Sequence, residues 1–313
     1  MGFLLSFNKT FCDILGLKRN VTIVMLMVLA IVLYCFFKWS NEINVEEISP
    51  VALQTQFIAD QIVFIWYIWC AGVLLAILVS AHAAGFISKE VTDGTLMLIV
   101  NKPINRYEII IGKLAALIVN SIMLLAIGYL FSILLLWGIL PLDMDSLQTL
   151  FGMMPSMILY AFLVALFFGS LSIAFSALMN SRIKIVMIAM TLIMYTFFFG
   201  VLVRFVVDKE GSNQYANLGL YSVDTGYHIS NTFYLLSNDI EFWDISPTHQ
   251  VFFGGYTGTY YMSGISGQDN QFGKVLYSNP TDYIHPAYSL FIVLGISAGA
   301  IGLAMWGLHR KEL

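Results

Sequence analysis

The sequence predicts an all-α integral membrane protein with six transmembrane helices, an N-terminal amphipathic interfacial helix and a sizeable extracytoplasmic segment between helices five and six. Of its 313 residues, 59% are hydrophobic and only 11% are charged, whereas roughly 25% of the residues in a soluble globular domain are charged. A soluble fold of this size could not cover its surface with so few polar groups. The composition therefore excludes a cytosolic enzyme, a disordered protein and a nucleic-acid-binding protein.

Six apolar stretches are long enough to cross a bilayer, which requires roughly 20 residues. The predicted spans are Val21–Phe37, Ile62–Ala84, Ile109–Ile139, Phe151–Met179, Ile183–Val207 and Ala287–Leu308. The third and fourth stretches are longer than a bilayer requires. We therefore expect these two helices to tilt or to project into water.

The basic residues predict the orientation of these spans. Lysine and arginine gather on one set of alternating segments, at Lys9, Lys18, Arg19, Lys89, Lys102, Arg106, Lys113, Arg182, Lys184, Arg310 and Lys311. The opposite segments hold only Lys38, Arg204, Lys209 and Lys274. Because segments rich in lysine and arginine remain in the cytosol, we expect a multi-pass protein of the cell membrane with both termini in the cytosol.

Ahead of the first span, apolar residues recur at helical spacing. They are Phe3, Leu4, Phe7, Phe11, Ile14 and Leu15, with polar residues between them. This pattern predicts an amphipathic helix over residues 2–19 that lies in the inner membrane interface. The alternative is a frayed cytosolic tail.

Between the fifth and sixth spans, residues 208–283 form a long outside segment rich in aromatic residues. We expect it to fold as an extracytoplasmic subdomain, because a disordered linker would lack this aromatic content. Its Asn231–Trp243 portion is predicted to be helical and capped by Ser230 or Asn231. The outside loop around Pro141–Thr149 is expected to be short.

The sequence contains no arrangement typical of catalysis. Its five histidines are scattered without a His-Glu-x-x-His pair, and the phosphate-binding pattern Gly-x-x-x-x-Gly-Lys-Ser/Thr is missing from the sequence. Cys12, Cys35 and Cys70 have neither the number nor the spacing of a disulfide framework. We therefore assign no catalytic, cofactor-binding or metal-binding residue and expect that the chain is not an enzyme.

Small residues predict where helices pack closely. Ala161, Ala165 and Gly169 form one face of the fourth span, which Ser170, Ser172 and Ser176 extend. Gly295 and Gly299 form a second face in the last span. Small residues at such spacing allow two membrane helices to approach each other, so we predict helix packing at both faces.

The inside loop at residues 85–106 is longer than a usual helix connection, which has about two to eight residues. Thr92 and Asp93 can cap a short helix that begins near Gly94, and Pro103 ends it. The predicted helix lies parallel to the membrane and is studded with charged residues. A loop of this length therefore has a role beyond connecting two spans.

At this loop the sequence resembles the permease subunits of type-2 ABC exporters. The family pattern is Glu-x-x-x-Gly-Thr-Leu, then Pro-x-x-Arg, then Gly-Lys. The matching residues are Glu90, Gly94, Thr95, Leu96, Pro103, Arg106, Gly112 and Lys113. The long fifth outside segment departs from the short re-entrant hairpin that is usual in this family.

The resemblance implies a single transmembrane permease domain over residues 1–313. Two permease subunits, identical or different, would pair in the bilayer and form the translocation path. Each would dock a separate cytosolic ATPase, which would hold ATP and magnesium, while this chain would bind no cofactor. The residues expected at the ATPase contact are Lys89, Glu90, Asp93, Gly94, Thr95, Leu96, Pro103 and Arg106.

Two other functions stay open at the level of the sequence. A receptor-like or scaffold membrane protein could bind a partner through the outside aromatic segment, but it would not need the elaborate inside loop. A membrane-embedded enzyme would need a cluster of catalytic residues. The inside loop therefore favours the permease.

Overall fold

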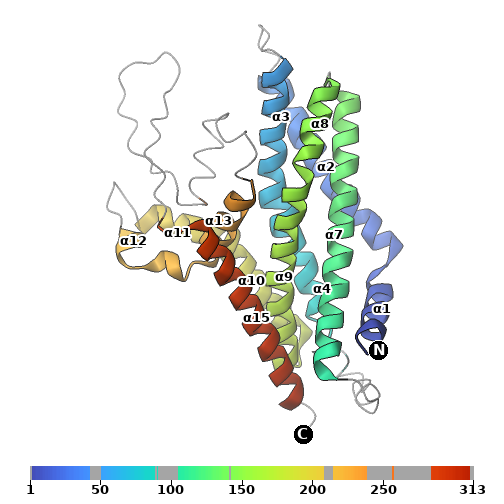
Figure 1. The fold of residues 1–313 in the computed structure, drawn as a ribbon, viewed down its shortest axis with the longest axis vertical. Coiled ribbons are helices and arrows are strands. Elements are labelled where there is room, and N and C mark those ends of the chain that lie inside the picture. The colour runs from blue at the N-terminus through green and yellow to red at the C-terminus, as the bar shows by residue number, and fades with distance from the viewer. Residues whose placement is uncertain are drawn as a thin grey trace.

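The computed structural model forms a bundle of long helices (Figure 1). It describes residues 2–42, 51–88, 90, 105–140, 142–207, 214–237, 256 and 283–310. The helices are α1 (Gly2–Ile14), α2 (Leu17–Glu42), α3 (Val51–Ile65), η1 (Trp66–Leu74), α4 (Leu75–Ala83), α7 (Arg106–Ile139), α8 (Met144–Gly152), α9 (Met154–Leu178), α10 (Arg182–Met194), η2 (Tyr195–Phe199), α11 (Gly200–Val207), α12 (Gln214–Asn217), η4 (Leu220–Ser222), α13 (Thr225–Ser237) and α15 (Pro286–Arg310). The described residues contain no strand.

Six helical stretches have the length and hydropathy of membrane spans, which confirms the prediction of an all-α membrane protein with six spans. They run over Leu17–Ser40, Ile58–Ala83, Tyr107–Ile139, Met144–Leu178, Arg182–Arg204 and Pro286–Arg310. Both chain termini lie at one end of the bundle, which we call the terminal end, as an even number of spans requires (Figure 1). The other end is called the opposite end.

The fourth span starts earlier than the sequence predicted. Most of the predicted short loop at Pro141–Thr149 is helical, because the side chain of Asp143 caps α8 and accepts a hydrogen bond of 2.8 Å from the amide of Ser146. Aspartate is among the best N-cap residues. A second helix, α9, follows at once with Pro155 in its first turn, a position where proline's missing N–H costs no helical hydrogen bond.

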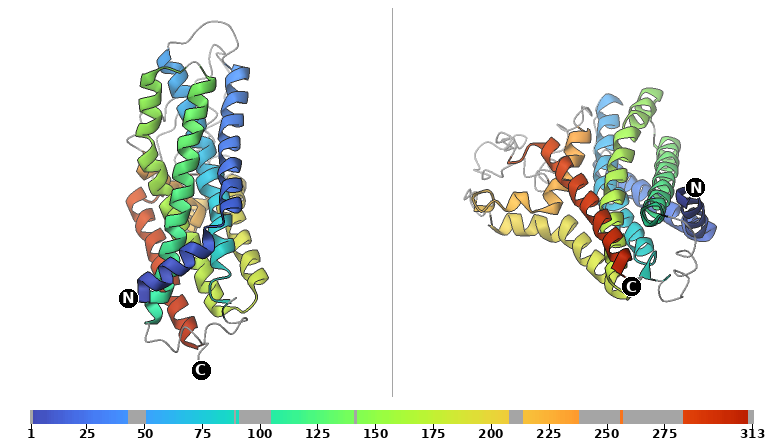
Figure 2. Two further views of the ribbon diagram at one scale, coloured as in Figure 1. Left: turned by 90° about the vertical axis from the view of Figure 1, so that its right-hand side faces the viewer. Right: turned by 60° about the horizontal axis from the view of Figure 1, so that its bottom comes forward.

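The N-terminal helix is also shorter than predicted. α1 ends at Ile14, and residues 17–19 of the predicted interfacial helix already belong to α2. Figure 2 (left) shows α1 lying at an angle across α7 near the terminal end. The chain therefore turns between α1 and the first span instead of continuing as one helix.

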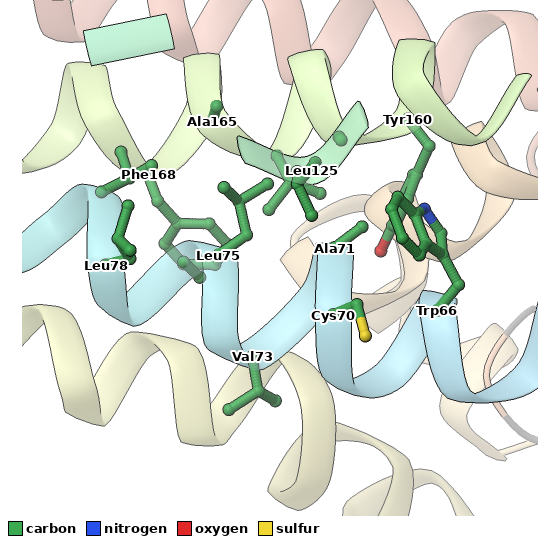
Figure 3. Close-up of a cluster of buried hydrophobic side chains, with 14 of the residues drawn as sticks. Trp66, Cys70, Ala71, Val73, Leu75, Leu78, Leu125, Tyr160, Ala165 and Phe168 are labelled. Carbon is green, nitrogen blue, oxygen red and sulfur yellow. The ribbon is translucent and has the colours of Figure 1, made fainter. Parts of the chain in front are cut away.

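Two spans contain wide π-helical turns, at η1 and η2, and these turns face each other. A Cβ added to Gly72 of η1 would lie 2.9 Å from Cε1 of Phe197 in η2 and 2.4 Å from the carbonyl oxygen of Tyr67. Only glycine allows this approach. Figure 3 shows Trp66, Cys70 and Ala71 in the hydrophobic core that η1 and α4 share with α7 and α9.

The part of residues 208–283 that the structure describes lies to one side of the bundle, where α11, α12 and α13 gather (Figure 1). α13 begins at Thr225, six residues before the predicted helix, and the side chain of Asp224 accepts a hydrogen bond of 3.1 Å from the amide of Tyr227. The predicted caps, Ser230 and Asn231, are buried inside this helix. Residues 238–243 of the predicted helix lie outside the described residues.

Candidate functional site

Most of the residues predicted to contact an ATPase fall outside the part of the chain that the structure describes. They are Lys89, Asp93, Gly94, Thr95, Leu96 and Pro103. Glu90 is described, and Arg106 is described as the first residue of α7. The part of the site that the structure describes consists of Glu90 and the segments that flank the loop, at the terminal end of the bundle.

Glu90 lies between two lysines from different helices. Its Oε2 is 2.5 Å from Nζ of Lys113 on α7, and its Oε1 is 3.5 Å from Nζ of Lys9 on α1. The Lys113 side chain is only 7% exposed, and its ammonium also donates to the carbonyl of Phe86 at 2.6 Å. A charge this buried requires a partner. The family resemblance implied that Glu90 contacts another subunit. Nothing in the sequence indicated that Glu90 pairs with lysines of its own chain.

Gly112, the residue before Lys113, allows α1 to lie close to α7. A Cβ added to Gly112 would lie 3.0 Å from the carbonyl oxygen of Phe3 and 3.0 Å from Cβ of Ser6. The hydroxyl of Ser6 donates to the carbonyl of Ile109 at 3.1 Å. The Gly-Lys pair of the motif therefore has two roles: the glycine admits α1, and the lysine holds Glu90.

Ser176 of α9 binds the first residues of the loop. Its fully buried hydroxyl accepts hydrogen bonds from the amides of Ile87 at 3.1 Å and Ser88 at 3.0 Å, and it donates to the carbonyl of Ala84 at 3.0 Å. The sequence placed Ser176 on a face of small packing residues. Its role in holding the loop was missed because a lone serine in an apolar helix carries no signal of its partner.

The two predicted packing faces have different surroundings. Ala161 and Ala165 are fully buried, and a Cβ added to Gly169 would lie 3.1 Å from Val79. Among the described residues, no atom would come within 4 Å of a Cβ added to Gly295 or Gly299. The last span therefore does not use these two glycines for packing within the described part of the chain. The prediction was wrong there because the spacing of small residues does not specify which helix covers them.

Gly307, which was not among the predicted packing residues, is the described glycine of the last span that makes a close contact. A Cβ added there would lie 3.1 Å from Cβ of Ala177 and 3.2 Å from its carbonyl carbon. The terminal end of α15 is thus packed against the end of α9, one residue beyond Ser176.

A buried ion pair joins α11 to the residue that precedes α13. Nε of Arg204 is 2.7 Å from Oδ2 of Asp224, and the two side chains are 5% and 0% exposed. The hydroxyl of Tyr215 donates to the same oxygen at 2.9 Å, and Nη1 of Arg204 donates to the carbonyl of Tyr256 at 2.6 Å. Burial by itself raises the pKa of the Asp224 carboxyl, but the charge of Arg204 and the hydrogen bonds outweigh it and lower the pKa below its ordinary value.

Aromatic residues attach α13 to the spans. The ring of Phe233 on α13 lies 4.8 Å, centroid to centroid, from both Tyr67 and Tyr160. The hydroxyl of Tyr67 is 2.5 Å from Oγ of Ser230, and the ring of Tyr256 lies 5.4 Å from that of Tyr67. The aromatic residues of the long segment were predicted to form a subdomain. Phe233 and Tyr256 belong to the same hydrophobic core as the spans, whereas Tyr215, Tyr221 and Tyr227 form a separate buried cluster.

His228 lies in a buried hydrogen-bond network. Nδ1 of His228 is 3.1 Å from the hydroxyl of Ser289, and its Nε2 is 3.0 Å from the carbonyl of Ser222. Burial lowers the pKa of His228, which favours the neutral ring in this network. Within the described ranges, no group of three or more His, Cys, Asp or Glu side chains could hold a metal ion.

The comparison with known proteins agrees with this architecture. The family model described as ABC-2 family transporter protein matches residues 5–313, almost the whole chain. No curated protein matches the sequence. The match covers nearly the full length of a chain that has six candidate membrane spans and carries the motif residues Glu90, Gly112 and Lys113. The chain therefore belongs to the ABC-2 transporter family and is a multi-pass membrane permease of an ABC transporter.

Proposed function

We propose that this permease forms the translocation path of an exporter and docks a separate cytosolic ABC ATPase through residues 85–106. Two permease subunits pair, and the ATPases hold ATP and magnesium. Closure of the ATPases on ATP displaces the loop and re-tilts the spans. The observation that supports the proposal is the attachment of the loop's first residues to two different spans, through Glu90 to Lys113 and through Ile87 and Ser88 to Ser176.

This function requires both termini in the cytosol of a cell and α13 on the outside. In intact cells, an impermeant thiol reagent is expected to label Val223→Cys and to leave Asn180→Cys unlabelled until the membrane is permeabilised. Val223 is 77% exposed between η4 and α13, and Asn180 is exposed between α9 and α10. Cys12 is replaced by serine, whereas Cys35 and Cys70 are buried and can remain. Labelling of position 180 before position 223 overturns the orientation.

The ATPase contact is tested by site-specific crosslinking in native membranes. A photoreactive amino acid at Thr95 is expected to capture an ABC ATPase, identified by mass spectrometry, and the same group at Val223 is expected to capture none. The purified complex should hydrolyse ATP, whereas the isolated permease should not. An intact, inserted permease that captures no ATPase from position 95 contradicts the proposal.

A further inference from the structure

The second span ends in a tight turn that leads into the loop. The amide of Gly85 donates to the carbonyl of His82 at 3.1 Å, and the amide of Phe86 donates to the carbonyl of Ala83 at 3.1 Å. The hydroxyl of Ser88 donates back to the carbonyl of Ala84 at 2.6 Å. These bonds give residues 84–88 a defined conformation before the chain enters the rest of the loop.

The hydroxyl of Ser176 makes three hydrogen bonds to this turn. It accepts from Ile87 and Ser88 and donates to Ala84, which uses one donor and two acceptor positions. A serine inside a helix usually donates to its own helix, as Ser170 does to Phe167 at 3.0 Å. Ser176 instead bonds backbone groups that lie some 90 residues away in the sequence, and it does so where water is excluded.

The next residue of α9 carries the contact onward. Ala177 packs against Gly307 so closely that an added Cβ would lie 3.1 Å away. Within two consecutive residues, α9 is therefore bound to the loop on one side and to the last span on another. Close-packed contacts of this kind transmit displacement because neither side can yield separately.

We infer that Ser176 is the positioning residue that makes the start of the loop and the α9–α15 pair move as one body. The inference rests on the proposed function, since it assumes that an ATPase moves the loop. Glu90 and Lys113 attach the loop to α7 through an ion pair in which the lysine is buried and the Glu90 side chain is 16% exposed. Ser176 attaches it to α9 through buried backbone hydrogen bonds, so the two attachments act on different spans.

The test compares Ser176→Ala with Ser170→Ala in the complex with the ATPase. Both changes remove one buried hydroxyl from α9, but only the first removes bonds to the loop. Nitroxide labels replace Leu29 on α2 and Leu303 on α15, which are both 52% exposed. The distance between the labels is measured without nucleotide and after trapping with ATP and vanadate.

In complexes isolated with bound ATPase, Ser176→Ala is expected to reduce the nucleotide-driven change in distance roughly twofold or more, while Ser170→Ala keeps the parental change. Ser176→Cys, which keeps a weak donor and acceptor, should give an intermediate change and serves if the alanine variant fails to insert. If both Ser176 variants show the same nucleotide-driven change in distance as the parent, the inference is overturned and the proposed function is not. A parent chain that binds no ATPase overturns the proposed function and the inference with it.

Discussion

Replacing Asp224 with alanine is expected to lower the free energy of unfolding by about 3–5 kcal/mol. The guanidinium of Arg204, 5% exposed, would lose the carboxylate of Asp224, and the hydroxyl of Tyr215 would lose the same acceptor. α13 would lose the side chain that accepts from its first turn. The thermal unfolding midpoint of the purified protein in detergent measures the effect.

The matched control removes both charges at once. In Arg204→Met/Asp224→Leu no buried charge is left alone, so the double variant should be more stable than Asp224→Ala. A single variant that unfolds within about 1 kcal/mol of the parent would show that water reaches Arg204.

The same ion pair predicts a dependence on pH. The pKa of Asp224 is lowered in the folded protein, so its contribution is fully present above the ordinary pKa of an aspartate. That contribution is lost as the pH falls through the lowered value. The parent should therefore lose stability on acidification, and the double variant should lose less of it over the same range.

Replacing Glu90 with lysine is expected to reduce the recovery of the ATPase roughly tenfold or more, because the change leaves a buried charge unpaired and repels its neighbours. Lys9, Lys113 and the new lysine would share one site, and Lys113 is only 7% exposed. The first residues of the loop would then leave α7. Co-purification of the ATPase and ATP hydrolysis by the complex measure the loss.

Two variants separate this mechanism from a general effect of charge. Glu108→Lys makes the same change in net charge on the first turn of α7, where Glu108 has no ion pair with another described residue, and it should behave like the parent. The exchange Glu90→Lys/Lys113→Glu restores opposite charges and should recover most of the binding. If Glu108→Lys loses as much as Glu90→Lys, the ion pair is not the cause.

The sequence predicted the parts of this fold that depend on local composition. Membrane spans were found because length and hydropathy are properties of one segment, and the Gly-Lys motif was found because its residues are adjacent. The start of α13 was placed six residues late, since Asp224 is held in place by Arg204, which lies 20 residues away. A turn residue whose partner is distant in sequence looks like any other aspartate.

The packing glycines show the same limit. Gly295 and Gly299 have the spacing of a helix contact, yet it is Gly307 that lies close to another helix, at Ala177 of α9. Which face of a helix is covered depends on the other helices, so a repeat of small residues predicts the ability to pack but not the partner. Glu90 and Ser176 were likewise visible as residue types, while their bonds depend on segments brought together by the whole bundle.

The π-helical turn η1 affects how the second span can change in length during evolution. Loss of one residue from a regular α-helix rotates everything beyond it by about 100°, which would turn the buried face of α4 away from α9. A π-helix has wider turns, with bonds such as that from the amide of Leu75 to the carbonyl of Cys70. A deletion between Trp66 and Leu74 can close one such turn to α-helical geometry and keep the faces before and after it in place. Natural variants of different length should therefore place their gaps in this stretch and not in α4.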